Sequence, residues 1–228
     1  MCYGIFERTR KLVIKDEEGA YFMNKVIRRL ISLALASTIA VSGISVFAVS
    51  ETCPHGKRTF NDHKLTGGVG EYGSFRRYYW VDSSMPSSFN SAITDAVNKW
   101  VNTTSSPGVT TSISIRKTSV KKDSSFDLYG TNLGANITGL TELWVFDKQI
   151  QDPSAQNWGW SKIYINKYNT VNYSTTTKRG LVAHELGHAM GLSHQPGLKY
   201  SSLMYNYDSR GRTTPAKIDC DNINHIYG

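Results

Sequence analysis

Residues 184–194 of the 228-residue chain read HELGHAMGLSH, and this stretch decides the expected fold and chemistry. On a helix, His184 and His188 are four residues apart, so their side chains share one face and can reach one metal ion. Gly191 stands where a helix can end in a left-handed turn, which brings the chain back to His194 as a third ligand. The spacing therefore predicts a zinc site with three histidine ligands.

Glu185 directly follows the first histidine, so its carboxylate stays outside the ligand set but can still touch a water at the ion. Structural zinc sites usually have four protein ligands, whereas three ligands leave a position for water. The simpler alternative is a set of ordinary surface or core histidines. A motif of this length is expected by chance in only about one of ten thousand such chains. We therefore interpret it as a catalytic zinc site with Glu185 as general base.

The same stretch resembles the metzincin zinc metallopeptidases, whose motif is His-Glu-x-x-His-x-x-Gly-x-x-His. That family also has a methionine turn beneath the metal, and Met204, ten residues after His194, lies in a stretch that fits it. Within the metzincins, residues 76–228 resemble the matrixins, peptidase family M10, in a bacterial-type secreted form. The final segment, residues 215–228, contributes to this resemblance. It implies that Gly191 and Met204 support the metal site.

The chain departs from related patterns at three points. Asn206 stands two residues after the methionine, where matrixins usually have proline. The sequence has no motif like the zinc-capping cysteine of many animal matrixin propeptides, so it does not support latency by that route. Tyr205 and Tyr207 flank the position of the astacin-type tyrosine, and neither is expected to take its role.

The resemblance implies an α/β (α+β) fold: a twisted, mostly parallel sheet with an antiparallel edge strand, packed by a sheet-backing helix, a zinc helix and a C-terminal helix. Apolar residues at helical spacing predict the sheet-backing helix over about residues 89–101, with Ser87 or Ser88 as its cap. The zinc helix is predicted over about residues 177–190.

Strands are predicted where aromatic or β-branched residues gather or alternate with polar ones. The predicted strands are residues 76–82, 110–117, 140–146 and 163–165, with a polar loop over 147–159. A last helix is predicted from Pro215, a favourable first helical residue, with Thr214 as its cap.

Residues 1–48 are predicted to be an N-terminal extension and secretory signal peptide. A short basic start at Met23, a candidate for the true start, runs into an uncharged apolar stretch, with cleavage expected after Ala48. The alternative is an uncleaved membrane anchor, because about 20 apolar residues can span a bilayer. We expect a secreted, extracellular protein with no stable membrane association after cleavage. An extended arm over 49–75 would precede a catalytic domain over 76–228.

Composition limits the classes of partner. The formal net charge is +8, and the Lys and Arg residues are scattered rather than clustered in a stripe, so nucleic-acid binding is not indicated. No feature of the sequence indicates an oligomer. After signal cleavage Cys53 and Cys220 remain, and in an oxidising compartment they are candidates for one disulfide. Two free thiols are the alternative.

The predicted function is that of a secreted zinc-dependent metalloendopeptidase with one catalytic Zn²⁺ and a protein or peptide substrate. The alternatives are a zinc hydrolase acting on a non-protein substrate or a cell-wall peptide, and a non-catalytic exported protein stabilised by zinc. Calcium is also compatible, although no calcium motif is present. We interpret His55, His63 and His225 as isolated surface or core residues. A substrate strand could pair with a sheet edge formed by residues 137–143 or 160–165.

Overall fold

The computed structural model of the chain describes residues 58–70, 77–209 and 211–228. The predicted signal segment, residues 1–48, lies outside these ranges, and so do Cys53 and His55. Within the described part of the chain, no helix has the length and apolar character needed to cross a bilayer.

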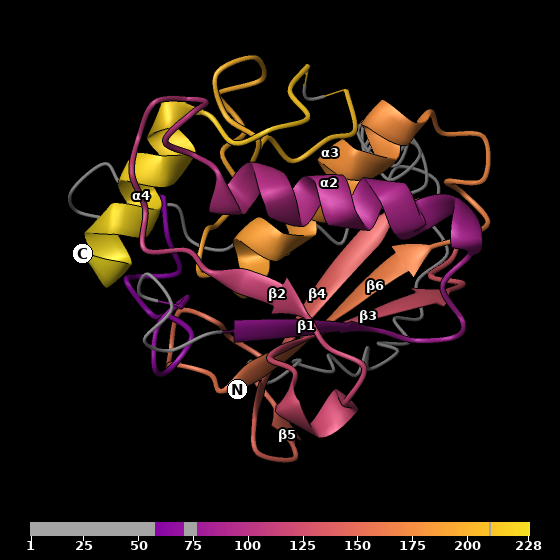
Figure 1. Cartoon of the computed structure of the whole chain (residues 1–228), viewed down its shortest axis with the longest axis horizontal. Helices are drawn as coiled ribbons and strands as arrows, with labels where there is room; N and C mark the ends of the chain where they lie inside the picture. Colours follow the sequence, from indigo (N-terminus) through magenta and orange to yellow (C-terminus); the bar gives the residue numbers. More distant parts are fainter. Residues whose placement is uncertain (1–57, 71–76, 210) are drawn as a thin grey trace, which may run out of the picture. The chain divides into compact units, whose positions relative to one another are not determined.

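A six-stranded mixed sheet forms the centre of the domain (Figure 1). Its strands, in spatial order, are β2 (Ile115–Lys117), β1 (Arg77–Val81), β3 (Phe126–Thr131), β6 (Trp160–Asn166), β4 (Gly139–Val145) and β5 (Lys148–Gln149). The first four run parallel to one another, β4 pairs antiparallel with β6, and β5 covers only one end of β4. The predicted mostly parallel sheet with an antiparallel edge strand is confirmed.

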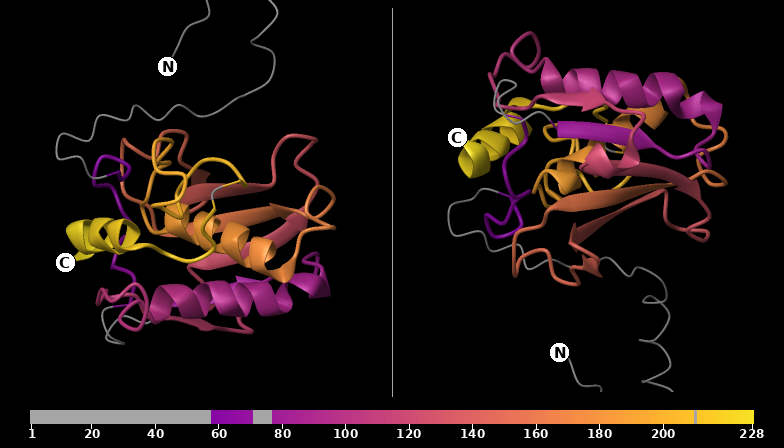
Figure 2. Two further views of the ribbon diagram at one scale, coloured as in Figure 1. Left: turned by 90° about the horizontal axis from the view of Figure 1, so that it is seen from above. Right: turned by 60° about the horizontal axis from the view of Figure 1, so that its bottom comes forward.

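Two helices cover one face of this sheet. Helices α2 (Asn90–Val101) and α3 (Thr175–Ala189) lie side by side on that face (Figure 1 and Figure 2). Strand β6 alternates accordingly: Ser161, Ile163 and Ile165 are buried, whereas its other side chains up to Ile165 are partly exposed. Helix α4 (Lys217–Tyr227) lies at one end of the domain (Figure 1). The main core therefore lies between the sheet and the α2–α3 pair.

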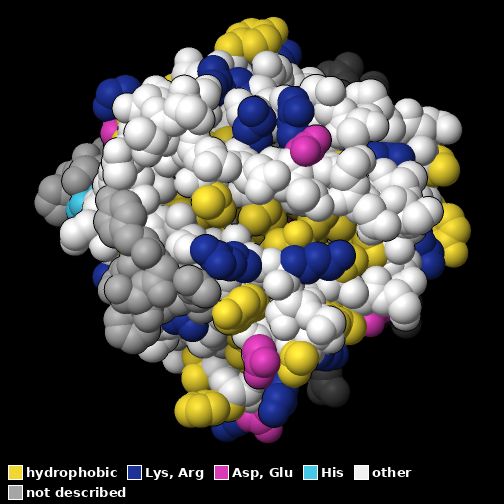
Figure 3. Space-filling model, viewed as in Figure 1, with side chains coloured by type: hydrophobic (Ala, Val, Ile, Leu, Met, Phe, Trp, Pro, Cys, Tyr) yellow, Lys and Arg dark blue, Asp and Glu magenta, His cyan; other side chains and the backbone are white. Residues whose placement is uncertain are grey.

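The opposite face of the sheet carries aromatic rings interleaved with lysines. Trp144 stacks on Trp160 with ring centroids 5.3 Å apart, and Tyr129 stacks on Tyr164 at 5.5 Å. The Nζ atom of Lys162 lies 3.7 Å from the Trp144 ring centroid. These contacts remove ring area from water without a covering helix. On the face drawn in Figure 3, Lys and Arg side chains form small groups among uncharged and hydrophobic side chains rather than a continuous stripe.

The strand predictions need four corrections. The strand predicted over residues 163–165 extends over Trp160–Asn166 as β6. No strand is predicted from the sequence where β3 lies. The strand predicted over residues 110–117 shortens to β2. Pairing with β1 begins where Arg77 N donates to Ser114 O (3.2 Å), whereas Ser114 N donates to Val69 O (2.8 Å) in the N-terminal segment. Strand β5 falls inside the predicted loop over 147–159.

Helix α2 has the predicted apolar face. Its buried residues are Ala92, Ile93, Ala96, Val97 and Trp100. The predicted serine cap is wrong, because a 3-10 turn over Ser87–Phe89 precedes the helix and Phe89 occupies the cap position without a side-chain bond. The Ser88 hydroxyl instead accepts a hydrogen bond from the Lys178 ammonium at 3.2 Å. The Ser88 side chain therefore links the start of α2 to α3.

The other two helices also begin differently from the prediction. Helix α3 begins two residues earlier than expected, where the Ser174 hydroxyl accepts from the backbone of the first turn at 3.1 Å. Helix α4 begins two residues after Pro215, and Thr214 is not its cap. The Asp219 carboxylate accepts from the cap residue's backbone N–H at 2.8 Å. Both starts follow from satisfying helix N–H groups with side-chain oxygens.

The described part of the predicted arm, residues 58–70, packs into the domain. Phe60, Leu65 and Val69 are buried in the core cluster. Leu65 forms a parallel bridge with Trp158, which precedes β6. This segment therefore contributes apolar area to the same core as the sheet.

Candidate metal centre and active site

Helix α3 carries the HELGH residues through the interior of the domain. Residues 180–187 of the helix are all buried, so this stretch has no solvent-facing side. Two indoles hold it: Trp100 Nε1 donates to Ala183 O at 2.8 Å, and Trp158 Nε1 donates to Ala189 O at 2.9 Å. Because indole N–H groups only donate, these bonds fix the helix against α2 and against the segment before β6.

The three motif histidines converge on one point. The Nε2 atoms of His184 and His188 are 3.2 Å apart, those of His184 and His194 are 3.3 Å apart, and those of His188 and His194 are 3.1 Å apart. A tetrahedral zinc ion with Zn–N bonds of about 2.0–2.1 Å separates its ligand nitrogens by about 3.3–3.4 Å. The donor type, the number of donors and their spacing therefore fit a zinc ion.

The other ring nitrogens explain why Nε2 faces this point. His184 Nδ1 lies 2.9 Å from Leu203 O, and His188 Nδ1 lies 2.7 Å from Leu192 O. A carbonyl oxygen can only accept, so each Nδ1 carries the hydrogen and each Nε2 keeps its lone pair. The two backbone carbonyls thus set both the tautomer and the ring orientation that a metal ligand needs.

Gly191 ends the helical segment in the conformation that its sequence position predicts. Its φ is +107°, and a Cβ there would lie 2.8 Å from Ile226 Cδ1. Two backbone hydrogen bonds to the N-terminal segment hold the following turn: Phe60 N donates to Gly191 O (3.1 Å), and Ser193 N donates to Arg58 O (3.2 Å). From this turn His194 faces the two histidines of α3.

Met204 is fully buried against the backbone of α3. A Cβ at Gly187 would overlap the Met204 Sδ atom and would lie 3.5 Å from Trp100 Cζ2. Gly187 therefore lets the thioether approach the helix between the two histidines that α3 carries. No role for Gly187 follows from the sequence, because this residue stands at an x position of the motif.

Asp219 supports the metal site from α4. Its Oδ2 accepts from Leu203 N (2.9 Å) and from Ala216 N (2.8 Å), and its Oδ1 accepts from Ser202 Oγ (2.5 Å). Burial raises the pKa of the Asp219 carboxyl, and these donors oppose that shift. Because Leu203 O holds His184, the contacts form a chain from α4 to a metal ligand. No motif in the sequence identifies this aspartate.

Glu185 follows His184 on α3, and its side chain lies against strand β4. Its side chain is only 4% exposed. The Thr141 hydroxyl lies 2.8 Å from Glu185 Oε2 and 3.0 Å from Glu185 O. A Cβ at Gly139 would lie 2.5 Å from Glu185 Oε1, so the carboxylate rests directly on the strand backbone. Glu185 is predicted from the sequence, whereas Gly139 and Thr141 are not.

The remaining candidate residues lie elsewhere. His63 Nδ1 is 3.3 Å from Asn157 Oδ1, and His225 Nε2 is 2.9 Å from Asp62 Oδ1. Across residues 58–70, 77–209 and 211–228, the motif histidines form the one group of three or more potential ligand side chains. The interpretation of His63 and His225 as separate from the metal site agrees with this arrangement.

Cys220 is buried on α4 and forms no disulfide with another residue of the described part of the chain, and burial raises the pKa of its thiol to about 12. Its predicted disulfide partner, Cys53, lies outside the described residues. The disulfide therefore stays a prediction.

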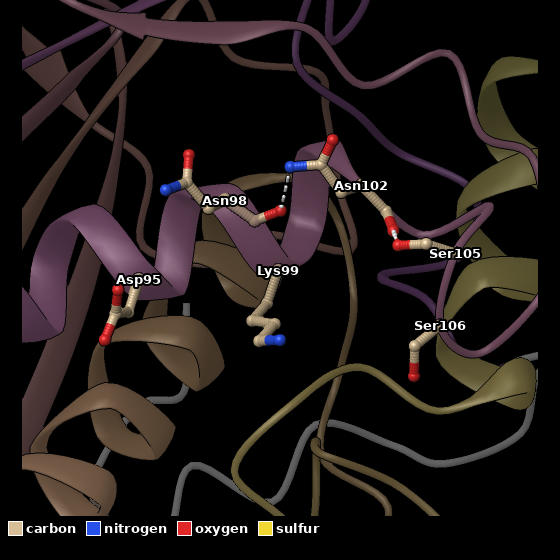
Figure 4. Close-up of a pocket in the computed structure, with 6 residues that line it drawn as sticks. All are labelled: Asp95, Asn98, Lys99, Asn102, Ser105 and Ser106. Atoms are coloured by element: carbon tan, nitrogen blue, oxygen red, sulfur yellow. Dashed lines mark hydrogen bonds between the residues drawn. The ribbon is translucent and has the colours of Figure 1, made fainter.

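A pocket on α2 is separate from this centre. Figure 4 shows its lining, which consists of Asp95, Asn98, Lys99, Asn102, Ser105 and Ser106. These side chains belong to the outer surface of α2 and the turn after it, away from the buried face that packs on α3. Neither the motif histidines nor Glu185 lines this pocket.

Three comparisons with known proteins bear on the family of this chain. The matrixin family model (Peptidase_M10) matches residues 83–228, which is more than half of the chain. A search of the curated proteins gives no match. Among solved structures, the chain is similar to high choriolytic enzyme 1, a hatching enzyme zinc-protease from Oryzias latipes (medaka fish). The identity is 16%, the TM-score is 0.41, and the match covers 72% of this chain and 92% of that chain. The family match carries the assignment: the chain belongs to the matrixins and is a zinc metalloendopeptidase.

Proposed function

We propose that this protease is exported, that His184, His188 and His194 hold its zinc ion, and that Glu185 is its general base. The observation that carries the proposal is the convergence of three Nε2 atoms at 3.1–3.3 Å from one another. A buried carboxylate follows the first of these histidines directly. Neutral imidazoles leave the positive charge of a bound ion uncompensated, which favours catalysis over a purely structural role.

Each residue has a defined part in peptide hydrolysis. When bound, a zinc ion supplies Lewis acidity that activates water and polarises the scissile carbonyl. Glu185 accepts the proton of the attacking water at a carboxylate oxygen and then passes it to the leaving amine. His184 and His188 are held in their orientation by Leu203 O and Leu192 O. The low exposure of Glu185 keeps bulk water from competing for its proton.

The substrate is proposed to pair with the open edge of β4. On one side β4 pairs with β6 along its length, and on the other β5 covers only Trp144 and Val145. Residues 139–142 therefore form an edge on which an extended peptide can add as a strand. The second edge considered from the sequence, residues 160–165, is wrong, because β6 lies between β3 and β4.

Export is proposed from the N-terminal sequence. Within residues 1–48, a short basic start at Met23 runs into an uncharged apolar run that ends in small residues. If the signal is cleaved, N-terminal sequencing of protein from the culture medium should begin near residue 49. Recovery of the intact chain from the membrane fraction would favour an uncleaved anchor instead.

The catalytic assignment is tested by Glu185→Ala. The variant should retain zinc, because the histidines are unchanged, but its kcat on casein or gelatin should fall by about 10²–10⁴-fold. Zinc content is measured by elemental analysis, and the wild type treated with a chelator serves as the metal-free control. A zinc-loaded Glu185→Ala protein that cleaves at the normal rate would rule out the role of Glu185. A zinc-loaded wild type that cleaves no protein would point to a different hydrolase substrate.

A further inference from the structure

Strand β4 contacts the Glu185 carboxylate with two adjacent inward-facing residues. Gly139 and Thr141 are separated by one residue, so they share the face of the strand that meets α3. Gly139 lies against Oε1, and Thr141 bonds Oε2. The two carboxylate oxygens thus rest on two consecutive positions of the same face.

Gly139 matters because of what it lacks. A Cβ there would lie 2.5 Å from Oε1, 2.8 Å from Cδ and 3.0 Å from Cγ of Glu185. Such distances are shorter than van der Waals contact, so any larger residue would push the carboxylate away. The backbone of Gly139 does not have the left-handed conformation that favours glycine. Close approach of the carboxylate is therefore the reason for glycine at this position.

Thr141 holds the same side chain by hydrogen bonding. Its hydroxyl is 2.8 Å from Glu185 Oε2 and 3.0 Å from the backbone oxygen of the same residue. A hydroxyl both donates and accepts, so it can bond a carboxylate and a carboxylic acid alike. The contact can thus persist before and after Glu185 takes up a proton.

The strand itself is well anchored. It pairs with β6 from Gly139 to Trp144. The loop before it is held by Asn166, whose Nδ2 donates to Gly134 O at 2.7 Å and to Ile137 O at 2.8 Å. A side chain that rests on β4 therefore rests on a fixed element, which is the condition for accurate placement of a reacting group.

We propose that Gly139 and Thr141 are positioning residues that set the orientation of the general base. This inference rests on the proposed function, in which Glu185 is the base and β4 offers its open edge to the substrate. One strand then aligns both the substrate and the base: its edge pairs with the peptide, and its inner face seats the carboxylate. Because the same strand positions both groups, the position of the base relative to the substrate is fixed.

The test uses Thr141→Val, which keeps the branched shape and removes the hydroxyl. A displaced base loses part of its catalytic contribution, so kcat should fall by about 10- to 100-fold. KM should stay within about twofold and the zinc content should be unchanged, since ligands and strand edge are intact. Thr141→Ser restores a hydroxyl and should recover most of the lost kcat. Thr104→Val, in the exposed turn after α2, is the matched control and should behave as the wild type.

Gly139→Ala tests the steric half of the seat, with Gly159→Ala as control, because a Cβ at Gly159 meets only Trp144 O at 3.8 Å. Crystal structures of the zinc-free variants provide a readout independent of activity. The Glu185 carboxylate should be displaced in Gly139→Ala and in Thr141→Val, and should keep its wild-type position in Thr141→Ser.

Wild-type kcat in Thr141→Val, or an unmoved carboxylate in both Gly139→Ala and Thr141→Val, would overturn the inference. Failure of Thr141→Ser to recover activity, with the fold intact, would also count against it. If Glu185→Ala itself cleaves normally, it is the proposed function that fails, so the two failures are distinguishable.

Discussion

The two sides of α3 are built in different ways. On the metal side, His184 and His188 are oriented by carbonyls of Leu203 and Leu192, all within about twenty residues of sequence. On the side that meets β4, the Glu185 carboxylate contacts Thr141, 44 residues earlier in the chain. The metal site thus depends mainly on residues close in sequence. The contact of Glu185 with β4, in contrast, can form only when α3 packs on the sheet. The loss of one side should leave the other largely intact.

The largest effect on stability is expected from removing the α4 support of the metal side. In Asp219→Ala three buried donors lose their acceptor, namely Ser202 Oγ and the N–H groups of Leu203 and Ala216. The free energy of unfolding should fall by about 3 kcal/mol, since buried donors without partners are costly. Denaturant titration of the zinc-free protein measures the change.

The control is Asp221→Ala on the same helix. Asp221 pairs with Lys217 at 2.8 Å in an exposed i, i+4 contact, so its removal should cost at most about 1 kcal/mol. Zinc affinity should also decrease in Asp219→Ala, because Leu203 O orients His184. A variant that unfolds like the wild type and binds zinc equally well would show that α4 does not support the metal side.

A smaller effect is expected from Gly187→Ala. The added Cβ overlaps Met204 Sδ, so the methionine turn must shift away from α3. Overpacking of this kind costs about 1–3 kcal/mol, part of which the flexible thioether relieves. Thermal unfolding with and without zinc measures it, with Gly159→Ala as the control. Equal stability of the two variants would mean that the approach of Met204 to α3 contributes nothing.

This contrast also explains what the sequence could predict. The three histidines, Glu185 and Gly191 lie in eleven consecutive residues, where helix periodicity and turn chemistry are enough to bring them together. The apolar face of α2 follows from the same periodicity. For these elements, the structure predicted from residues close in sequence is also the one that the tertiary contacts stabilise.

The features that were missed depend on contacts distant in sequence. Strand β3 contains Asp127 and Gly130, which are unfavourable in strands, and it forms because β1 and β6 pair with it on both sides. The contact of Thr141 with Glu185 and that of Asp219 with Leu203 join separate elements, and neither residue belongs to a motif. The cap of α4 is different, because it is a local contact from Ala216 N to Asp219, three residues later. The sequence does not predict it, since the cap residue is an alanine, which has no side-chain oxygen to mark the position.

The most direct test of the central claim is a crystal structure of the purified protein with diffraction data collected at the zinc absorption edge. We predict one ion per chain, bonded to Nε2 of His184, His188 and His194 at about 2.0–2.1 Å, with Glu185 outside the ligand set. Folded protein that takes up no zinc, or that holds it at other residues, would contradict the claim.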